Sequence, residues 1–252
     1  MDAELNNFFK YLAAESGKII KDYFRKPITI DNKPDNSPVT IADKLVEEKL
    51  RELISKKYPQ HGIIGEEFGS INDDAEYKWV IDPIDGTKSF ICGTITFGTL
   101  IALLKNEEPI IGCFNQPILN EFLIGDNSKT YLNDVQVYVK KTTELKDSIL
   151  LTTDHRNIKK HRDIESFNYL IDQVKIYRNW GDCYGYYLLA TGFADIMIDP
   201  IMAIWDTAAI IPLIRGAGGI ITDYYGGDPL KGNSIIASST QELHTKVLEI
   251  LN

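Results

Sequence analysis

The sequence predicts a mixed α/β fold, and two observations indicate it. Apolar residues recur at helical spacing near both ends of the chain, in residues 5–23 and 241–251. Between them lie short β-branched runs, several of which stop at acidic residues, as in residues 61–67 and 79–85. A chain of 252 residues has room for one large α/β domain or two small ones.

The charge balance argues against two classes of partner. Lys and Arg total 27 and Asp and Glu 36, so the net charge is −9. We therefore expect no nucleic acid and no anionic membrane as partners, although a small anionic substrate remains compatible if metal ions reverse the local charge. Three cysteines without a Cys-x-x-Cys pair, and no basic, apolar leader, favour a cytoplasmic protein.

The first part of the chain predicts two amphipathic helices. The first covers residues 5–23 and ends before Pro27, and residues 31–38 are polar and proline-rich, which predicts a loop. A second helix follows and ends before Pro59, with its Leu, Val and Ile side chains inside and its Lys and Glu side chains outside.

Residues 79–90, which read WVIDPIDGTKSF, are the most informative stretch. An apolar strand leads into two carboxylates, and Pro83 should end that strand at Asp82 because proline cannot continue a sheet ladder. Gly86 permits a tight turn and a close approach of a ligand, and a short helix that starts there would favour an anion. Asp82 and Asp85 repel each other unless a cation lies between them. Asp-Pro and Asp-Gly alone would indicate only a turn, but the whole string predicts a site for divalent metal ions and a phosphate.

Other acidic residues leave two interpretations open. Asp43, in the first turn of the second helix, is either a capping acid or a carboxylate that orients a catalytic hydroxyl. Glu66 and Glu67 end a short strand and are either ligand-binding or solvated. Asp206 stands before an apolar helical run and is either an N-cap or a metal ligand.

The remaining elements follow from periodicity and turn signals. Strands are predicted near residues 96–104, 110–115, 121–124, 131–139, 148–152, 174–178 and 194–198, and helices near residues 159–172, 182–190, 208–214 and 241–251. Hairpin signals after residue 104 favour antiparallel pairing.

Taken together, these motifs resemble the inositol monophosphatase superfamily. Glu-Glu at residues 66–67, Asp-Pro-Ile-Asp-Gly-Thr at 82–87 and Trp-Asp at 205–206 occur in the family's order. The resemblance spans nearly the whole chain. It implies a single domain over 1–252, in an αβαβα layered fold, with halves of about 1–145 and 146–252. It also implies Mg²⁺-dependent hydrolysis of a phosphate monoester and a homodimer.

The resemblance also implies roles for individual residues. Glu66, Asp82 and the carbonyl of Ile84 would hold one Mg²⁺, and Asp82, Asp85 and Asp206 a second. Thr87, hydrogen-bonded to Asp43, would orient or deprotonate a metal-activated water together with Glu66. The amides of Gly86 and Thr87 would hold the phosphate, and Glu67 would support the site from behind. Oxygen ligands without a His or Cys cluster agree with Mg²⁺.

The substrate is predicted from smaller features. Lys88-Ser89-Phe90 and Gly181-Asp182-Cys183 look most like the histidinol-phosphate phosphatase branch. Histidinol phosphate carries a cationic amine, which suits substrate contacts by Asp85, Asp182 and Asp199, although Asp182 is equally interpreted as the N-cap of its helix. The alternatives are an inositol monophosphatase of broad specificity, a 3′-phosphoadenosine 5′-phosphate phosphatase and a non-catalytic metal-binding regulator.

Overall fold

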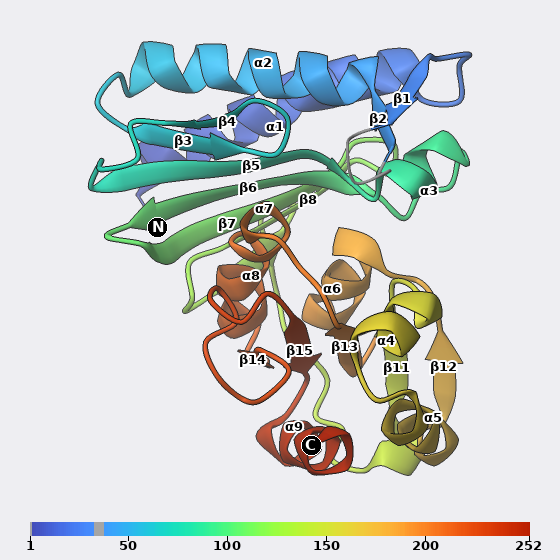
Figure 1. Cartoon of the computed structure of the whole chain (residues 1–252). Helices are drawn as coiled ribbons and strands as arrows, with labels where there is room; N and C mark the ends of the chain where they lie inside the picture. Colours follow the sequence, from blue (N-terminus) through green and yellow to red (C-terminus); the bar gives the residue numbers. More distant parts are fainter. Residues whose placement is uncertain (1, 33–37) are drawn as a thin grey trace.

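The protein is built from five alternating layers of helices and sheets. The computed structural model describes residues 2–32 and 38–252. Helices α1 and α2 cover an eight-stranded sheet, α6 and α8 lie beneath that sheet, and a five-stranded sheet with α4, α5 and α9 completes the stack (Figure 1). The predicted αβαβα fold is therefore confirmed. None of the helices in the described ranges is both long and apolar enough to cross a membrane.

The helices are α1 (Ala3–Tyr23), α2 (Ile41–Lys57), α3 (Thr87–Ile91), η1 (Leu145–Asp147), α4 (His155–His161), α5 (Ile164–Gln173), α6 (Asp182–Ala190), α7 (Ile204–Thr207), α8 (Ile210–Gly216) and α9 (Gln241–Leu251). The strands are β1 (Ile30–Asn32), β2 (Pro38–Thr40), β3 (Gly62–Gly65), β4 (Gly69–Ile71), β5 (Tyr77–Asp85), β6 (Gly98–Lys105), β7 (Glu108–Gln116), β8 (Glu121–Gly125), β9 (Thr130–Leu132), β10 (Val135–Val137), β11 (Ile149–Thr152), β12 (Ile176–Arg178), β13 (Ile196–Asp199), β14 (Ile220–Thr222) and β15 (Ile235–Ser238).

The eight-stranded sheet runs in the order β10-β9-β8-β7-β6-β5-β3-β4. Its strands pair antiparallel except for β3 and β5, which are parallel, so the carboxyl ends of these two strands lie at the same edge. Phe9 and Leu12 of α1 pack with Trp79 of β5 in the core above the sheet. Burying these apolar faces is the main stabilising contribution of this layer.

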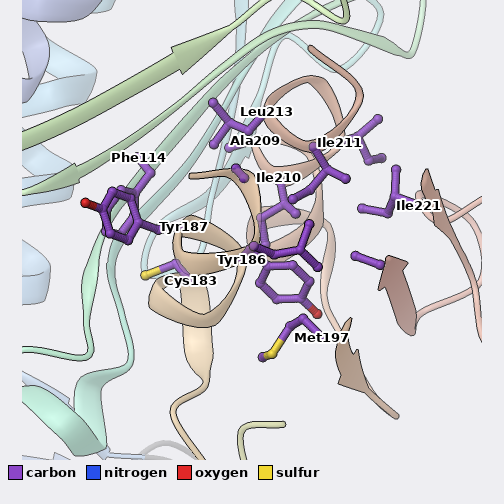
Figure 2. Close-up of a cluster of buried hydrophobic side chains, with 14 of the residues drawn as sticks. Phe114, Cys183, Tyr186, Tyr187, Met197, Ala209, Ile210, Ile211, Leu213 and Ile221 are labelled. Atoms are coloured by element: carbon purple, nitrogen blue, oxygen red, sulfur yellow. The ribbon is translucent and has the colours of Figure 1, made fainter. Parts of the chain in front are cut away.

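The five-stranded sheet runs in the order β12-β11-β13-β15-β14 and pairs β11 in parallel with both β12 and β13. The core between the two sheets is formed by α6 and α8, and Figure 2 shows Tyr186, Ile210 and Met197 among its buried side chains. This central layer joins the sheets, because its helices are apolar on both sides and cannot face water.

Strand β5 does not end at Asp82, as Pro83 led us to expect. It continues to Asp85, and its register with β6 shifts between Asp82 and Asp85. The shift removes the need for an amide hydrogen at the proline, and the Pro83 carbonyl accepts a hydrogen bond from Thr99 Oγ1 at 2.9 Å. The irregular strand end is what brings the acidic residues to the site.

Three other expectations need correction. The predicted loop at residues 31–38 begins and ends in the paired strands β1 and β2, and residues 33–37 lie outside the described residues. The run at 131–139 is a hairpin, β9–β10, that turns at Asn133 and Asp134, both with positive φ. The helix predicted at 159–172 is two helices, because Asp163 caps a new helix through the amides of Glu165 and Ser166.

Candidate active site

Three carboxylates meet at the irregular end of β5. Asp82 and Asp85 come from the strand and Asp206 from α7, and one oxygen of each lies within 4.8 Å of the other two. Asp206 precedes the apolar helix α8, as predicted, but it lies in the separate short helix α7 and is not the N-cap of α8, which is Ala209. Its Oδ2 accepts a hydrogen bond from the Ala203 amide at 2.8 Å, so this residue caps α7 and also belongs to the cluster.

The electrostatics of this cluster favour a bound cation. Burial raises the pKa of Asp82, and the neighbouring Glu66, Asp85 and Asp206 raise it further. Burial likewise raises the pKa of Asp85, with Asp182 and Asp206 adding repulsion. Within the described ranges, Asp82 Oδ1 is buried and has no hydrogen-bond partner. A hard divalent cation would satisfy this oxygen and offset the repulsion, so the residues present fit such a metal ion.

A hydroxyl and a carboxylate from separate elements meet beside the cluster. Thr87 Oγ1 lies 3.4 Å from Asp43 Oδ1 and 3.1 Å from the Ile84 carbonyl oxygen. The other oxygen of Asp43 accepts a hydrogen bond from the Thr40 amide at 2.8 Å. One oxygen of Asp43 therefore caps α2, and the other accepts a hydrogen bond from the Thr87 hydroxyl, so the contacts are compatible with both interpretations.

Gly86 occupies a position that other residues would strain. Its φ is +86°, and it precedes α3 as the N-cap residue. A Cβ at this position would lie 2.8 Å from the Thr96 carbonyl oxygen. The chain can therefore make this turn beside the carboxylates only with glycine.

A cavity of about 340 Å³ opens beside the cluster. The first half of the chain lines it with residues 85–89 and Glu66, and the second half contributes Thr153, Asp154, Asn157, Asp182, residues 199–202 and Asp206. The structure therefore brings all the predicted acidic site residues to one place, with Asp43 and the buried Asp82 directly behind the cavity wall.

Two further carboxylates in this wall have altered acidity. Asp199 accepts hydrogen bonds from Tyr186 Oη at 3.0 Å and from the Thr153 amide at 3.1 Å, and its burial raises its pKa to about 7. Burial raises the pKa of Asp182 to about 6. The N-cap interpretation of Asp182 is wrong, because Gly181 is the N-cap and the Asp182 carboxylate accepts from Ser89 Oγ at 3.2 Å.

Several residues of the cavity wall were not predicted from the sequence. Thr153, Asp154 and Asn157 line it, and the first two directly follow β11. A polar pair at the end of a strand was a usable signal, since ligands gather at strand ends in α/β folds. Glu47 of α2 differs from the prediction that the Glu side chains of this helix lie outside, because it is fully buried.

The five layers and the buried carboxylate cluster define a layered α/β protein whose site fits divalent metal ions. The profile of the Inositol monophosphatase family matches residues 1–252, and the chain belongs to this family. The protein is therefore a hydrolase of phosphate monoesters, and metal dependence is typical of the family.

Relatives and a solved structure agree with this assignment. The chain is 40% identical to "Bifunctional phosphatase IMPL2, chloroplastic" from Arabidopsis thaliana over 99% of this chain and 76% of that protein. It is 39% identical to a histidinol-phosphatase from Chlorobaculum parvum over 85% of this chain and 84% of that protein. An inositol monophosphatase structure from Zymomonas mobilis superposes with a TM-score of 0.88 at 33% identity, and the match covers 100% of this chain and 99% of that one. The predicted resemblance is confirmed.

Proposed function

We propose that the protein is a Mg²⁺-dependent phosphatase that hydrolyses histidinol phosphate or a related small alcohol phosphate with a cationic group. One observation carries the proposal: the cavity beside the carboxylate cluster is lined, on its second-half side, by Asp154, Asp182 and Asp199. When ionised, these three carboxyl groups attract a positively charged leaving group, whereas a neutral polyol gains nothing from their charge. The histidinol-phosphatase relative supports this choice.

The carboxylate cluster and the family resemblance together support one set of metal ligands. Glu66, Asp82 and the Ile84 carbonyl would hold one Mg²⁺, and Asp82, Asp85 and Asp206 a second. When bound, the ions supply a water of lowered pKa and neutralise charge on the phosphate and the leaving oxygen. Two sites that share Asp82 explain why this residue is buried among other acids.

The chain's own residues position the reacting groups. Thr87 Oγ1, held by Asp43, orients or deprotonates the attacking water together with Glu66. The amides of Gly86 and Thr87 hold phosphate oxygens at the turn. Because water attacks directly, no covalent phosphoenzyme is required. Asp182 and Asp199 contact the cationic end of the substrate, and Asp85 borders both the metal ions and the substrate.

The main alternative is an inositol monophosphatase of broad specificity. The similarity to an inositol monophosphatase structure from Zymomonas mobilis, at 33% identity over the whole chain, supports this alternative. By analogy with the superfamily, we expect the protein to be a homodimer. From its charge and cysteine content, we expect it to be cytoplasmic and to act without nucleic acid or membrane.

The decisive experiment compares phosphate release from histidinol phosphate, inositol 1-phosphate and 3′-phosphoadenosine 5′-phosphate, with Mg²⁺ and with EDTA. We expect Mg²⁺-dependent release and the highest kcat/KM with histidinol phosphate. A preference for inositol 1-phosphate would refute the substrate and support the main alternative. Release in EDTA would refute the metal dependence, and Mg²⁺ binding without turnover of any phosphate would indicate a regulator.

A further inference from the structure

A buried carboxylate on α2 holds the turn that carries Glu66. Asp43, Glu47 and Arg51 are spaced four residues apart on this helix, so they lie along one face. Glu47 is fully buried and forms a salt bridge with Arg51, whose Nε lies 2.7 Å from Glu47 Oε1. A buried acid is retained only where its oxygens are hydrogen-bonded, so its partners indicate its purpose.

Those partners are the two residues after Glu66. The Glu67 amide donates to Glu47 Oε2 at 2.7 Å, and the Phe68 amide donates to Glu47 Oε1 at 3.1 Å. Arg51 also donates to the Gly69 carbonyl at the start of β4. The Glu47–Arg51 pair therefore holds the backbone that joins β3 to β4.

The opposite side of Glu66 is held by the strand that carries the metal ligands. The Glu66 amide donates to the Ile81 carbonyl at 3.3 Å, next to Asp82. Before it, Gly65 leaves no room for a side chain, because a Cβ there would lie 2.0 Å from Glu47 Oε1. The backbone of Glu66 is thus fixed between β5 on one side and Glu47 on the other.

We propose that Glu47 is a positioning residue for the phosphatase reaction, which places the Glu66 carboxylate at the metal cluster through the amides of Glu67 and Phe68. The inference rests on the proposed function. The same face of α2 orients Thr87 through Asp43, so one helix aligns two groups of the site from outside the cavity. Removing a residue that supports a metal ligand typically weakens metal binding or activity by about 10–100-fold.

The test is Glu47→Gln, which keeps the shape of the side chain but offers one accepting oxygen to two amide donors. We expect Mg²⁺ binding measured by calorimetry to weaken about 10–100-fold, and kcat to fall at low Mg²⁺. The KM for the phosphate monoester, measured at saturating Mg²⁺, should stay unchanged. Leu50→Ala, a buried position on the same helix, and Glu52→Gln, an exposed acid, serve as controls. Leu50→Ala should lower the melting temperature while both controls keep Mg²⁺ affinity.

The outcomes separate this inference from the function on which it rests. If the wild-type chain binds Mg²⁺ and releases phosphate while Glu47→Gln matches it in both, the inference is overturned. If the wild type shows no Mg²⁺-dependent turnover, the proposed function fails instead, and the calorimetry still tests the role of Glu47 in metal binding. If Glu47→Gln does not fold, Arg51→Gln tests the inference instead. Weakened Mg²⁺ binding in Arg51→Gln would support the positioning role of the Glu47–Arg51 pair, and unchanged binding would overturn it.

Discussion

Thr87 Oγ1 lies 3.4 Å from Asp43 Oδ1, although 44 residues separate the two in sequence. The first turn of α2 and the start of α3 therefore meet at the cavity, with the hydroxyl between an acid and the Ile84 carbonyl. Four consequences of the site and its surroundings can be measured.

The first concerns this hydroxyl. Thr87→Ala should lower kcat by about 10²–10⁴-fold, because the attacking water loses the group that orients it or takes its proton. Thr87→Ser keeps the hydroxyl and should retain most activity. Steady-state phosphate release measures both variants, and calorimetry should show unchanged Mg²⁺ affinity in Thr87→Ala. Equal activity of the Ala and wild-type proteins would exclude a catalytic role for Thr87.

The second concerns Asp82, the proposed ligand of both metal ions. Burial and neighbouring acids raise the pKa of Asp82, so its charge destabilises the metal-free fold. Asp82→Asn should therefore melt in EDTA at or above the wild-type temperature. Mg²⁺ at a hundredfold excess over Kd should stabilise the wild type by about 3 kcal/mol and leave the variant unchanged.

Thermal unfolding with and without Mg²⁺ provides this measurement, and Asp172→Asn, an exposed acid, is the matched control. If Asp82→Asn gains as much stability from Mg²⁺ as the wild type does, Asp82 is not a ligand.

The third concerns substrate binding. Asp199 has a pKa raised to about 7 by burial, and the hydrogen bond from Tyr186 holds that pKa down by stabilising the charged form. Tyr186→Phe should therefore raise the pKa of Asp199 further. Since a cationic substrate needs the ionised acid, its KM should increase as pH falls through that pKa, and the increase should begin at higher pH in the variant.

Comparing the KM of Tyr186→Phe with that of the wild type at each pH cancels the titration of the substrate itself. The exposed Tyr138→Phe is the control and should follow the wild type. Coincident profiles for Tyr186→Phe and the wild type would show that Asp199 does not bind the cationic group.

The fourth concerns acid stability. His244 is buried between Thr222 Oγ1 and Ser238 Oγ, and burial lowers its pKa from 6.5 to about 4. The folded protein therefore favours neutral His244. Its contribution to the free energy of unfolding is complete above pH 6.5 and is lost as pH falls toward about 4. The full effect is about 3 kcal/mol of unfolding free energy.

Urea unfolding at about pH 7.5 and about pH 5 measures this effect. Between these two pH values, the free energy of unfolding of the wild type should fall by about 2 kcal/mol more than that of His244→Gln. His161→Gln is the control in a less buried position and should lose stability as the wild type does. Parallel losses in the wild type and His244→Gln would show that His244 does not cause the acid sensitivity.

The sequence by itself determined the core of the carboxylate cluster and most of the architecture. Asp82 and Asp85 stand in one short stretch at a strand end, so local chain geometry already brings them together. Helices α6 and α9 were predicted at their observed bounds, and for α9 the reason is its periodicity, because apolar spacing reports which helix face is buried.

Tertiary structure alone decided which acids are buried and what they contact. Glu47 was predicted to be solvated, since a single Glu on an amphipathic helix is ordinarily on its outer face, yet the amides of Glu67 and Phe68 enclose it. Pro83 was expected to end β5, but the shifted pairing with β6 lets the strand continue to Asp85. Burial, hydrogen bonding and pKa depend on groups that approach from distant parts of the chain, and no local pattern encodes that approach.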